Sequence, residues 1–200
     1  MRRAVLVMTA TFVPAVVPAI TLAVPAPAQP PGPSAARPQP EATDCLGGQG
    51  YLRARIRGAL NRDLDFRQHL TCEGESRPDG SGIHLGFAAP PGPHRLRLIF
   101  GIRGVREGVA GRELPVNLTV MEEGGRIFAT RGESRCTIDD LQQRRQPGGS
   151  AHTWRITVRG FCTDPVNALG QSPAQSLGKG GRIVVSRFDF AGVVTFASGR

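Results

Sequence analysis

The stretch VVSRFDFAGVVTF, residues 184–196, alternates apolar and polar side chains over most of its length. A period of two is typical of a β-strand that buries one of its faces in a core. The side chains expected to point inward are Val184, Phe188, Phe190, Val194 and Phe196. Those expected to point outward are Arg187, Asp189 and Thr195. The stretch therefore predicts one long, half-buried strand near the end of the chain.

The same period recurs along the chain. Apolar residues alternate within residues 52–56, 83–87, 96–100, 116–120 and 154–158, and a short apolar run lies at 127–128. Two segments predict short helices instead: residues 137–145 follow a capping-box pattern, and residues 163–170 begin with Thr-Asp-Pro and end at glycine. About seven to nine strands separated by turns indicate an all-β fold. We expect a single antiparallel β-sandwich-like domain with short helical turns, stapled by disulfides.

The composition agrees with a folded β domain. The 200 residues include 26 Gly and 17 Pro, which disfavours a helical bundle or a coiled coil. Hydrophobic residues at 40% and charged residues at 20% lie too near globular averages for wholesale disorder. The formal net charge is +9, and Lys179 is the only lysine among 25 basic residues. The chain is therefore basic through arginine, which suits bidentate binding of phosphate or carboxylate.

The first 43 residues predict a leader and a linker. Residues 1–28 have a basic start, an uncharged apolar stretch and an Ala-x-Ala ending, as expected of a signal peptide cleaved after Ala28. Residues 29–43 contain five prolines and no bulky apolar side chain, so they predict an extended Pro-rich linker. Residues 44–200 then form the β domain. Cleavage removes Arg2 and Arg3 and lowers the net charge from +9 to +7, and no transmembrane segment is expected after it.

Four cysteines remain in the β domain, and four allow three pairings. A hairpin that sets Ile56 against Phe66 and Leu52 against Leu70 places Cys72 opposite Gly50, within reach of Cys45. The other two cysteines each end a predicted strand region. We therefore predict the disulfides Cys45–Cys72 and Cys136–Cys162. Each closes a loop of about 27 residues, worth roughly 3 kcal/mol in the chain-entropy model.

The arginines expected to point outward come in stripes along the strands. They are Arg53, Arg55, Arg57, Arg95, Arg97, Arg155 and Arg159. If these stripes are adjacent, they form an anion-binding face. The alternative is that outward strand positions simply need polar residues, and that Arg57 pairs with Asp65 across the hairpin. Few aromatic residues are available for stacking on bases, so nucleic acid is not the expected partner.

No pattern of catalytic or metal-ligating residues stands out. The four histidines, His69, His84, His94 and His152, form neither an H-x-H nor an H-E-x-x-H motif. Residues 132–136 begin like a nucleophile elbow, but Cys136 replaces the second glycine. We therefore predict no catalytic residues, no metal site and no cofactor.

Four segments are distinctive: residues 70–74, 128–136, 159–162 and 186–192. With these segments the chain resembles a group of small exported proteins of high-GC proteobacteria, over about residues 51–196. The group has no assigned activity. The resemblance implies a periplasmic, disulfide-bonded domain and carries over no catalytic residues.

The leader, the cysteines and the arginine stripes together predict a periplasmic or secreted, non-catalytic binding module. Its expected partner is an anionic envelope component or another protein. Two alternatives remain: a small secreted metal-dependent enzyme or hydrolase that uses the histidines, and a purely structural envelope protein.

Overall fold

Eleven β-strands and one 3-10 turn are present in the computed structural model, which describes residues 44–92, 95–131, 135–169 and 181–198. The expected signal peptide and linker lie outside the described residues. The 3-10 turn η1 spans Cys45–Gly48. The strands are β1 Tyr51–Gly58, β2 Arg62–Phe66, β3 Thr71–Ser76, β4 Gly82–Ala88, β5 Leu96–Arg103, β6 Leu114–Glu122, β7 Ile127–Ala129, β8 Cys136–Arg145, β9 Thr153–Cys162, β10 Val166–Ala168 and β11 Arg182–Thr195.

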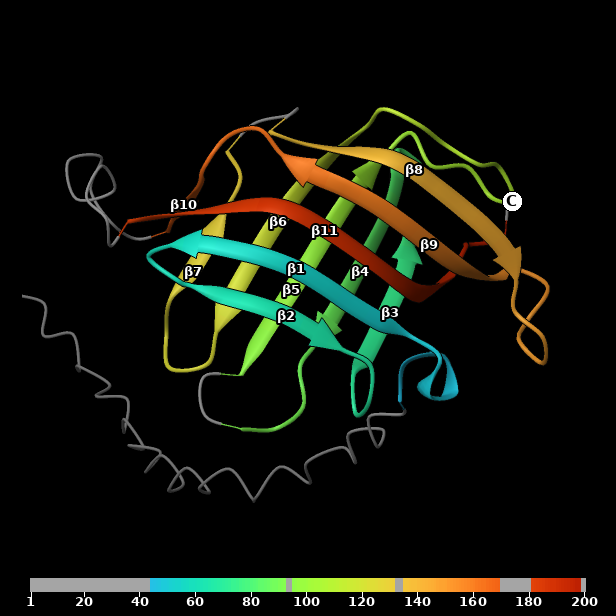
Figure 1. Cartoon of the computed structure of the whole chain (residues 1–200). Helices are drawn as coiled ribbons and strands as arrows, with labels where there is room; N and C mark the ends of the chain where they lie inside the picture. Colours follow the sequence, from blue (N-terminus) through green and yellow to red (C-terminus); the bar gives the residue numbers. More distant parts are fainter. Residues whose placement is uncertain (1–43, 93–94, 132–134, 170–180, 199–200) are drawn as a thin grey trace, which may run out of the picture. The chain divides into compact units, whose positions relative to one another are not determined.

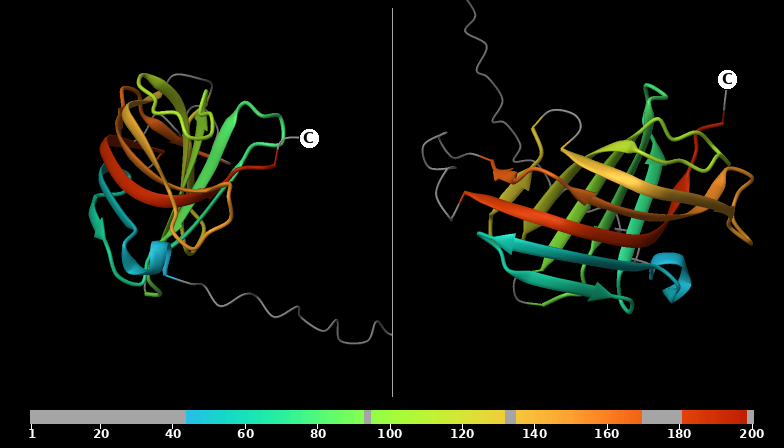
Figure 2. Two further views of the ribbon diagram at one scale, coloured as in Figure 1. Left: turned by 90° about the vertical axis from the view of Figure 1, so that its right-hand side faces the viewer. Right: turned by 45° about the horizontal axis from the view of Figure 1, so that its top comes forward.

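The strands form two layers (Figure 1). One layer is an antiparallel meander in chain order, β3-β4-β5-β6-β7. The other has the order β2-β1-β11-β9-β8 and is also antiparallel. Strands of one layer run across those of the other at a steep angle, as the further views show (Figure 2). The layers are joined where β8 pairs with β6, where β10 pairs with both β7 and β11, and where Thr195 of β11 meets Glu75 of β3 in a parallel pair.

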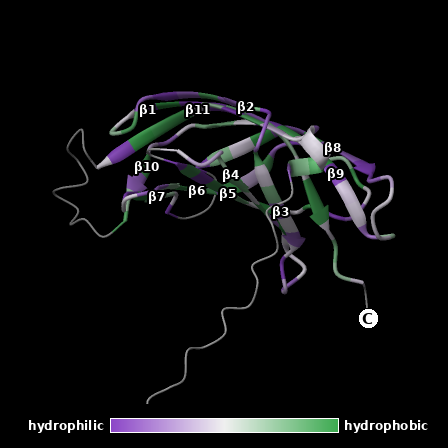
Figure 3. Ribbon diagram, turned by 90° about the horizontal axis from the view of Figure 1, so that it is seen from below, coloured by the Kyte–Doolittle hydropathy of each residue, from purple (hydrophilic) through white to green (hydrophobic). Residues whose placement is uncertain are grey.

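The core lies between the layers and is rich in phenylalanine. The rings of Phe87, Phe100, Phe188 and Phe190 pack with centroids 4.5–6.2 Å apart, and all four residues are at most 1% exposed. Hydrophobic and hydrophilic residues alternate along the strands (Figure 3), as a period of two requires. The predicted all-β, sandwich-like fold is confirmed.

The long strand β11 departs from the prediction at its start. Val184 is 37% exposed, whereas Ile183 and Val185 are buried, so the expected inward position of Val184 is wrong. The cause is a β-bulge: Arg55 pairs with Arg187 and Ile56 with Val185, which leaves Ser186 without a partner on β1. The extra residue shifts the alternation by one position, so that the inward set continues at Phe188.

Both predicted helices are wrong. Residues 137–145 belong to strand β8, and residues 166–168 form strand β10. In β8 the ladder to β9 skips Asp139, and this bulge sets the buried side chains of Ile138 and Leu141 three residues apart. The helix prediction rests on the capping-box pattern at the start of this segment, and a spacing of three is also compatible with a helix face. Pairing of each segment with two other strands overrides the capping signals.

The hairpin of β1 and β2 is tighter than predicted. Leu52 pairs with Phe66 and Ala54 with Leu64, so the register differs from the expected one by four residues. The side-chain oxygen of Asn61 accepts a hydrogen bond from the backbone N–H of Gly58 (3.2 Å), which closes a short turn. Leu70 lies beyond β2, where its carbonyl accepts a 2.6 Å hydrogen bond from the backbone N–H of Cys45.

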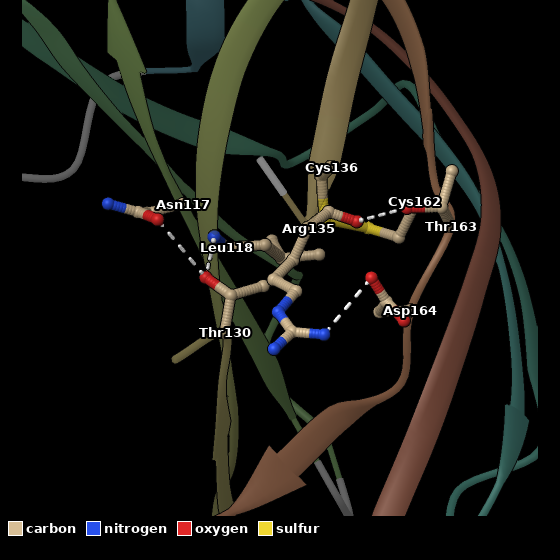
Figure 4. Close-up of a disulfide and its surroundings, with 8 residues drawn as sticks. All are labelled: Asn117, Leu118, Thr130, Arg135, Cys136, Cys162, Thr163 and Asp164. Atoms are coloured by element: carbon tan, nitrogen blue, oxygen red, sulfur yellow. Dashed lines mark hydrogen bonds and ion pairs between the residues drawn. A yellow bond between two sulfur atoms is a disulfide. The ribbon is translucent and has the colours of Figure 1, made fainter. Parts of the chain in front are cut away.

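Both predicted disulfides are confirmed. Cys45–Cys72 ties η1 to β3, although the ladder partner of Cys72 is Phe87 and not Gly50. Cys136–Cys162 joins directly opposed residues of β8 and β9 (Figure 4). Next to it, Arg135 pairs with Asp164 (Nη1–Oδ2 3.1 Å). Its carbonyl also accepts a hydrogen bond from the backbone N–H of Thr163 (3.0 Å).

Candidate anion-binding face

The predicted arginine stripes divide between the two layers. Strands β1 and β9 lie on either side of β11, so the arginines of β1 and β9 do share one outer face. Arg95 and Arg97 belong to the other layer, where Arg97 pairs with Glu73. Arg95 donates through Nε to the carbonyl of Ala89 (2.8 Å). The seven arginines therefore form two groups, and the larger one lies on the β2-β1-β11-β9-β8 layer. That group consists of Arg53, Arg55, Arg57, Arg155 and Arg159.

One line of cross-strand neighbours on this face alternates in charge over five strands. We call it the paired row; from β2 to β8 it comprises Asp65, Arg53, Asp189, Arg159 and Asp140. The Arg53 guanidinium lies 3.4 Å from Asp65 and 3.5 Å from Asp189, and Arg159 lies 3.6 Å from Asp140. Opposite charges on neighbouring strands attract one another, so the arginines of this row are neutralised within the protein.

Asp189 is the least exposed acid of the paired row, with 14% of its side chain accessible. The Tyr51 hydroxyl donates a 2.7 Å hydrogen bond to Asp189 Oδ1, and the Arg53 guanidinium lies over the Tyr51 ring at 5.1 Å from its centroid. Burial, followed by the hydrogen bond to Asp189, raises the pKa of Tyr51 to about 12. The paired row is thus held in place by several mutual contacts and has a structural role.

The next line along the same strands is not balanced. We call it the open row; from β2 to β8 it comprises Asp63, Arg55, Arg187, Phe161 and Thr137. The β9–β11 ladder ends one residue earlier, at Phe188 and Gly160, so Arg187 and Phe161 are joined only by a hollow that both of them line. Arg55 and Arg187 are directly opposite each other. Arg55 lies 3.6 Å from Asp63, but that carboxylate also accepts a 2.8 Å hydrogen bond from Arg57. Within the described part of the chain Arg187 has no ion-pair partner.

The hydrogen bond from Arg57 holds the pKa of Asp63 below its ordinary value. Asp63 is therefore ionised at neutral pH, yet it serves two guanidinium groups. The open row keeps an excess of positive charge between β1 and β11. This excess is the feature that an anionic ligand would meet.

Two hollows in the surface lie on either side of Arg187, which lines both. The first holds about 350 Å³ and is lined by Arg55, Asp63 and Leu64, and also by Arg53 and Asp189 of the paired row. The second holds about 380 Å³ and is lined by Phe161, Ser186 and Asp139, and also by Arg159 of the paired row. The open row therefore crosses a surface that is hollowed on both sides of its free cation.

The second hollow is formed where two β-bulges meet. Ser186 is the extra residue of β11 and Asp139 the extra residue of β8, and Phe161 lies on β9 between them. Beneath it, a Cβ on Gly160 would meet the Thr137 carbonyl and the Phe188 ring, so only glycine fits there. Bulges redirect side chains and are frequent beside functional sites.

Sequence reasoning found part of this face. It predicted Arg55 as anion-binding and placed Arg187 outward, but it did not include Arg187 in the site. Ser186, Asp139 and Phe161 were missed entirely. A usable signal was present, because the inward residues Val185 and Phe188 are three apart, as are Ile138 and Leu141, and both gaps break the period of two.

The histidines lie on separate elements. His69 is in the exposed turn after β2 with a φ of 53°, and His84 is on the outer face of β4. His152 lies before β9, with Nδ1 3.1 Å from both carboxylate oxygens of Glu107. His94 lies outside the described residues. Over the ranges that the structure describes, no group of three or more His, Cys, Asp or Glu side chains could hold a metal ion.

Glu107 has a structural role in this part of the molecule. It accepts a 2.8 Å hydrogen bond from the Trp154 indole, and this bond, with the one from His152, holds the pKa of Glu107 below its ordinary value. The contacts fasten the β5–β6 connection to the β8–β9 hairpin.

Comparison with known proteins gives no match to a family model, to a curated protein or to a solved structure. None of the helical residues in the described ranges forms a helix long and apolar enough to cross a membrane. The two disulfides are compatible with an extracytoplasmic protein.

Proposed function

We propose that this protein is an exported, non-catalytic binding module that captures an anionic group of an envelope component on its open row. The observation that carries the proposal is the pair of opposed guanidinium groups of Arg55 and Arg187, with no ion pair to Arg187 among the described residues. The backbone that carries the proposed site is held in place, because both arginines project from long, hydrogen-bonded strands.

The charge arrangement itself supports a ligand. Like charges directly opposite each other on neighbouring strands destabilise a sheet. The adjacent paired row shows that this sheet can place an aspartate beside each arginine. An anion between Arg55 and Arg187 would remove the repulsion, and guanidinium groups bind phosphate and carboxylate through charge-assisted hydrogen bonds.

Export to the periplasm or the medium is part of the proposal. It is supported by the predicted leader and by two disulfides, which persist in oxidising compartments. Mass spectrometry of protein exported by its own leader tests this part. We expect the mass of residues 29–200 less four hydrogens, two for each disulfide. A full-length mass, or free thiols, would contradict export.

Binding is tested with immobilised lipopolysaccharide, whose phosphate groups serve as the anionic envelope probe. We expect saturable binding that weakens as salt rises, and a loss of about tenfold or more in the double variant Arg55→Gln/Arg187→Gln. Arg112→Gln, an exposed arginine of the β5–β6 connection, is the matched control and should bind as the unaltered protein does. No saturable binding would favour the purely structural alternative, and equal losses in the control would show non-specific charge attraction.

A further inference from the structure

We propose that the ligand of the open row is a saccharide carrying an isolated carboxylate or phosphate, and not a continuous polyanion. This inference rests on the proposed function and concerns the same site. It follows from three features of the row: where its negative charges lie, what surrounds Phe161, and how far the two hollows extend.

The open row ends in a free carboxylate at one side only. Asp63 at the β2 end is shared by Arg55 and Arg57, whereas the exposed Asp139, which lines the hollow toward β8, has no ion pair in the described ranges. A polymer with a negative charge on every unit that extends from Arg187 toward Phe161 would place a charge beside Asp139. Such repulsion weakens the binding of a uniformly charged polymer, so the site favours a ligand with a single anionic group.

The second hollow offers contacts of a different kind. Phe161 is partly exposed there and presents an aromatic surface, while Asp139 accepts hydrogen bonds and Ser186 can both donate and accept them. An apolar wall with a few placed polar groups is the usual make-up of a small-ligand site. A sugar ring has an apolar C–H face and hydroxyl groups at its edge, and it matches this set.

The dimensions fit two sugar units. Arg55, Arg187 and Phe161 lie on the three neighbouring strands β1, β11 and β9. Neighbouring strands are about 4.8 Å apart, so the row extends roughly 10 Å from Arg55 to Phe161. We expect the saccharide to run across the strands, with its anionic group at the two arginines and a neutral ring against Phe161.

The experiment compares three probes by titration calorimetry on the mature, oxidised protein. They are a disaccharide of glucuronic acid and N-acetylglucosamine, the neutral disaccharide maltose, and a single-stranded oligonucleotide as a uniform polyanion. We expect the carboxylated disaccharide to bind about tenfold or more tightly than either of the others, because it alone brings a carboxylate to the two arginines and a neutral ring to Phe161, with no second charge beside Asp139. An oligonucleotide that binds as tightly through Arg187 would overturn the inference.

Variants separate this inference from the proposed function. Phe161→Leu should weaken the disaccharide about fivefold or more, and Phe161→Tyr should restore it, since the aromatic face is what binds. Asp139→Asn should weaken the disaccharide and strengthen the oligonucleotide, whereas Asp44→Asn, an exposed aspartate before η1, should change neither. If Arg187→Gln abolishes binding while Phe161→Leu has no effect, the proposed function stands and the saccharide inference fails. If no anionic probe binds, or Arg187→Gln changes nothing, the proposed function itself fails.

Discussion

The paired row and the open row lie side by side on the same strands and contain the same kinds of charged residue, yet they differ in what they leave exposed. In the paired row each arginine has an aspartate on both neighbouring strands, and the Tyr51 hydroxyl donates a hydrogen bond to Asp189. In the open row Arg55 meets Arg187 instead. A shift of two residues along a strand thus separates a self-neutralising surface from one with free positive charge.

The difference shows that the number of arginines on a face says little about binding. Whether an arginine is free to bind a ligand depends on the register of the strands, because the register determines which side chain lies next to each guanidinium group. The bulge at Ser186 separates Arg187 from the apolar residues before it, and the bulge at Asp139 brings a carboxylate toward Phe161. The predictions below test this contrast between the rows, beginning with the largest expected effect.

Removal of a disulfide should have the largest effect on stability. The Cys136–Cys162 bond holds β8 to β9 beside Phe161, so Cys136→Ser/Cys162→Ser should lower the free energy of unfolding by about 3 kcal/mol. We expect it also to weaken ligand binding at the open row, because Phe161 and Asp139 lose their common support. Urea unfolding and calorimetry measure the two effects.

The matched control is Cys45→Ser/Cys72→Ser, whose disulfide spans a nearly equal sequence separation of 27 residues against 26. It should lose a similar free energy of unfolding while the folded protein keeps its affinity. Equal losses of affinity in both double variants would show that binding follows the general stability of the fold and not local support of Phe161 by the β8–β9 disulfide.

Single substitutions should separate the rows by stability. Asp189→Asn leaves a nearly buried position without its charge and weakens the contacts to Tyr51 and Arg53, so the free energy of unfolding should fall by about 1–3 kcal/mol. Arg187→Gln changes an exposed side chain and should alter it by less than about 0.5 kcal/mol. Chemical denaturation of the two variants measures both values. Equal destabilisation would contradict a structural role confined to the paired row.

The smallest effect is a titration. Tyr51 is the only tyrosine of the chain, so the ultraviolet absorbance of tyrosinate reports it directly. Its pKa is raised from 10.0 to about 12 in the folded protein, and the folded state therefore holds the proton more tightly than the unfolded state. The contribution of the Tyr51 proton to the free energy of unfolding is therefore complete below pH 10 and is lost as the pH rises through 12.

Asp189→Asn should bring the Tyr51 titration closer to its ordinary range, and Arg187→Gln should leave it unchanged. Tyr51→Phe should remove this contribution to the fall in unfolding free energy above pH 10. If the Tyr51 titration is the same with and without the Asp189 carboxylate, the hydrogen bond between Tyr51 and Asp189 is contradicted.

The sequence was sufficient for the all-β class, for most strand positions and for the Cys136–Cys162 disulfide, because each depends on local alternation or on cysteines at strand ends. The Cys45–Cys72 disulfide was also predicted correctly, but from a hairpin register that is wrong. It was not sufficient where a bulge breaks the alternation. Val184 is predicted inward because the local pattern does not show the bulge at Ser186, and residues 137–145 are predicted to be helical because of their capping-box pattern, in a segment whose alternation the bulge at Asp139 interrupts. A bulge is fixed by pairing with another strand, which the local pattern does not contain.

The site was harder to predict than the fold. Arg53 and Arg55 look alike in sequence, and they differ in their partners on β11: Arg53 faces Asp189, whereas Arg55 faces Arg187. The predicted hairpin register paired Arg57 with Asp65, whereas Asp65 faces Arg53. Charge pairing across strands depends on such registers, and an error of four residues exchanges every partner.

The most direct test measures the affinity of the carboxylated disaccharide for two single variants, Arg187→Gln and Arg155→Gln. Each replaces one arginine on the same face, and the two positions lie on the neighbouring strands β11 and β9. We predict a loss of about tenfold or more for Arg187→Gln and a change within about twofold for Arg155→Gln, because Arg187 lines both hollows, whereas Arg155 lies outside them and contacts Gln49. Equal losses in the two variants would contradict a site confined to the open row and would show a uniformly basic face.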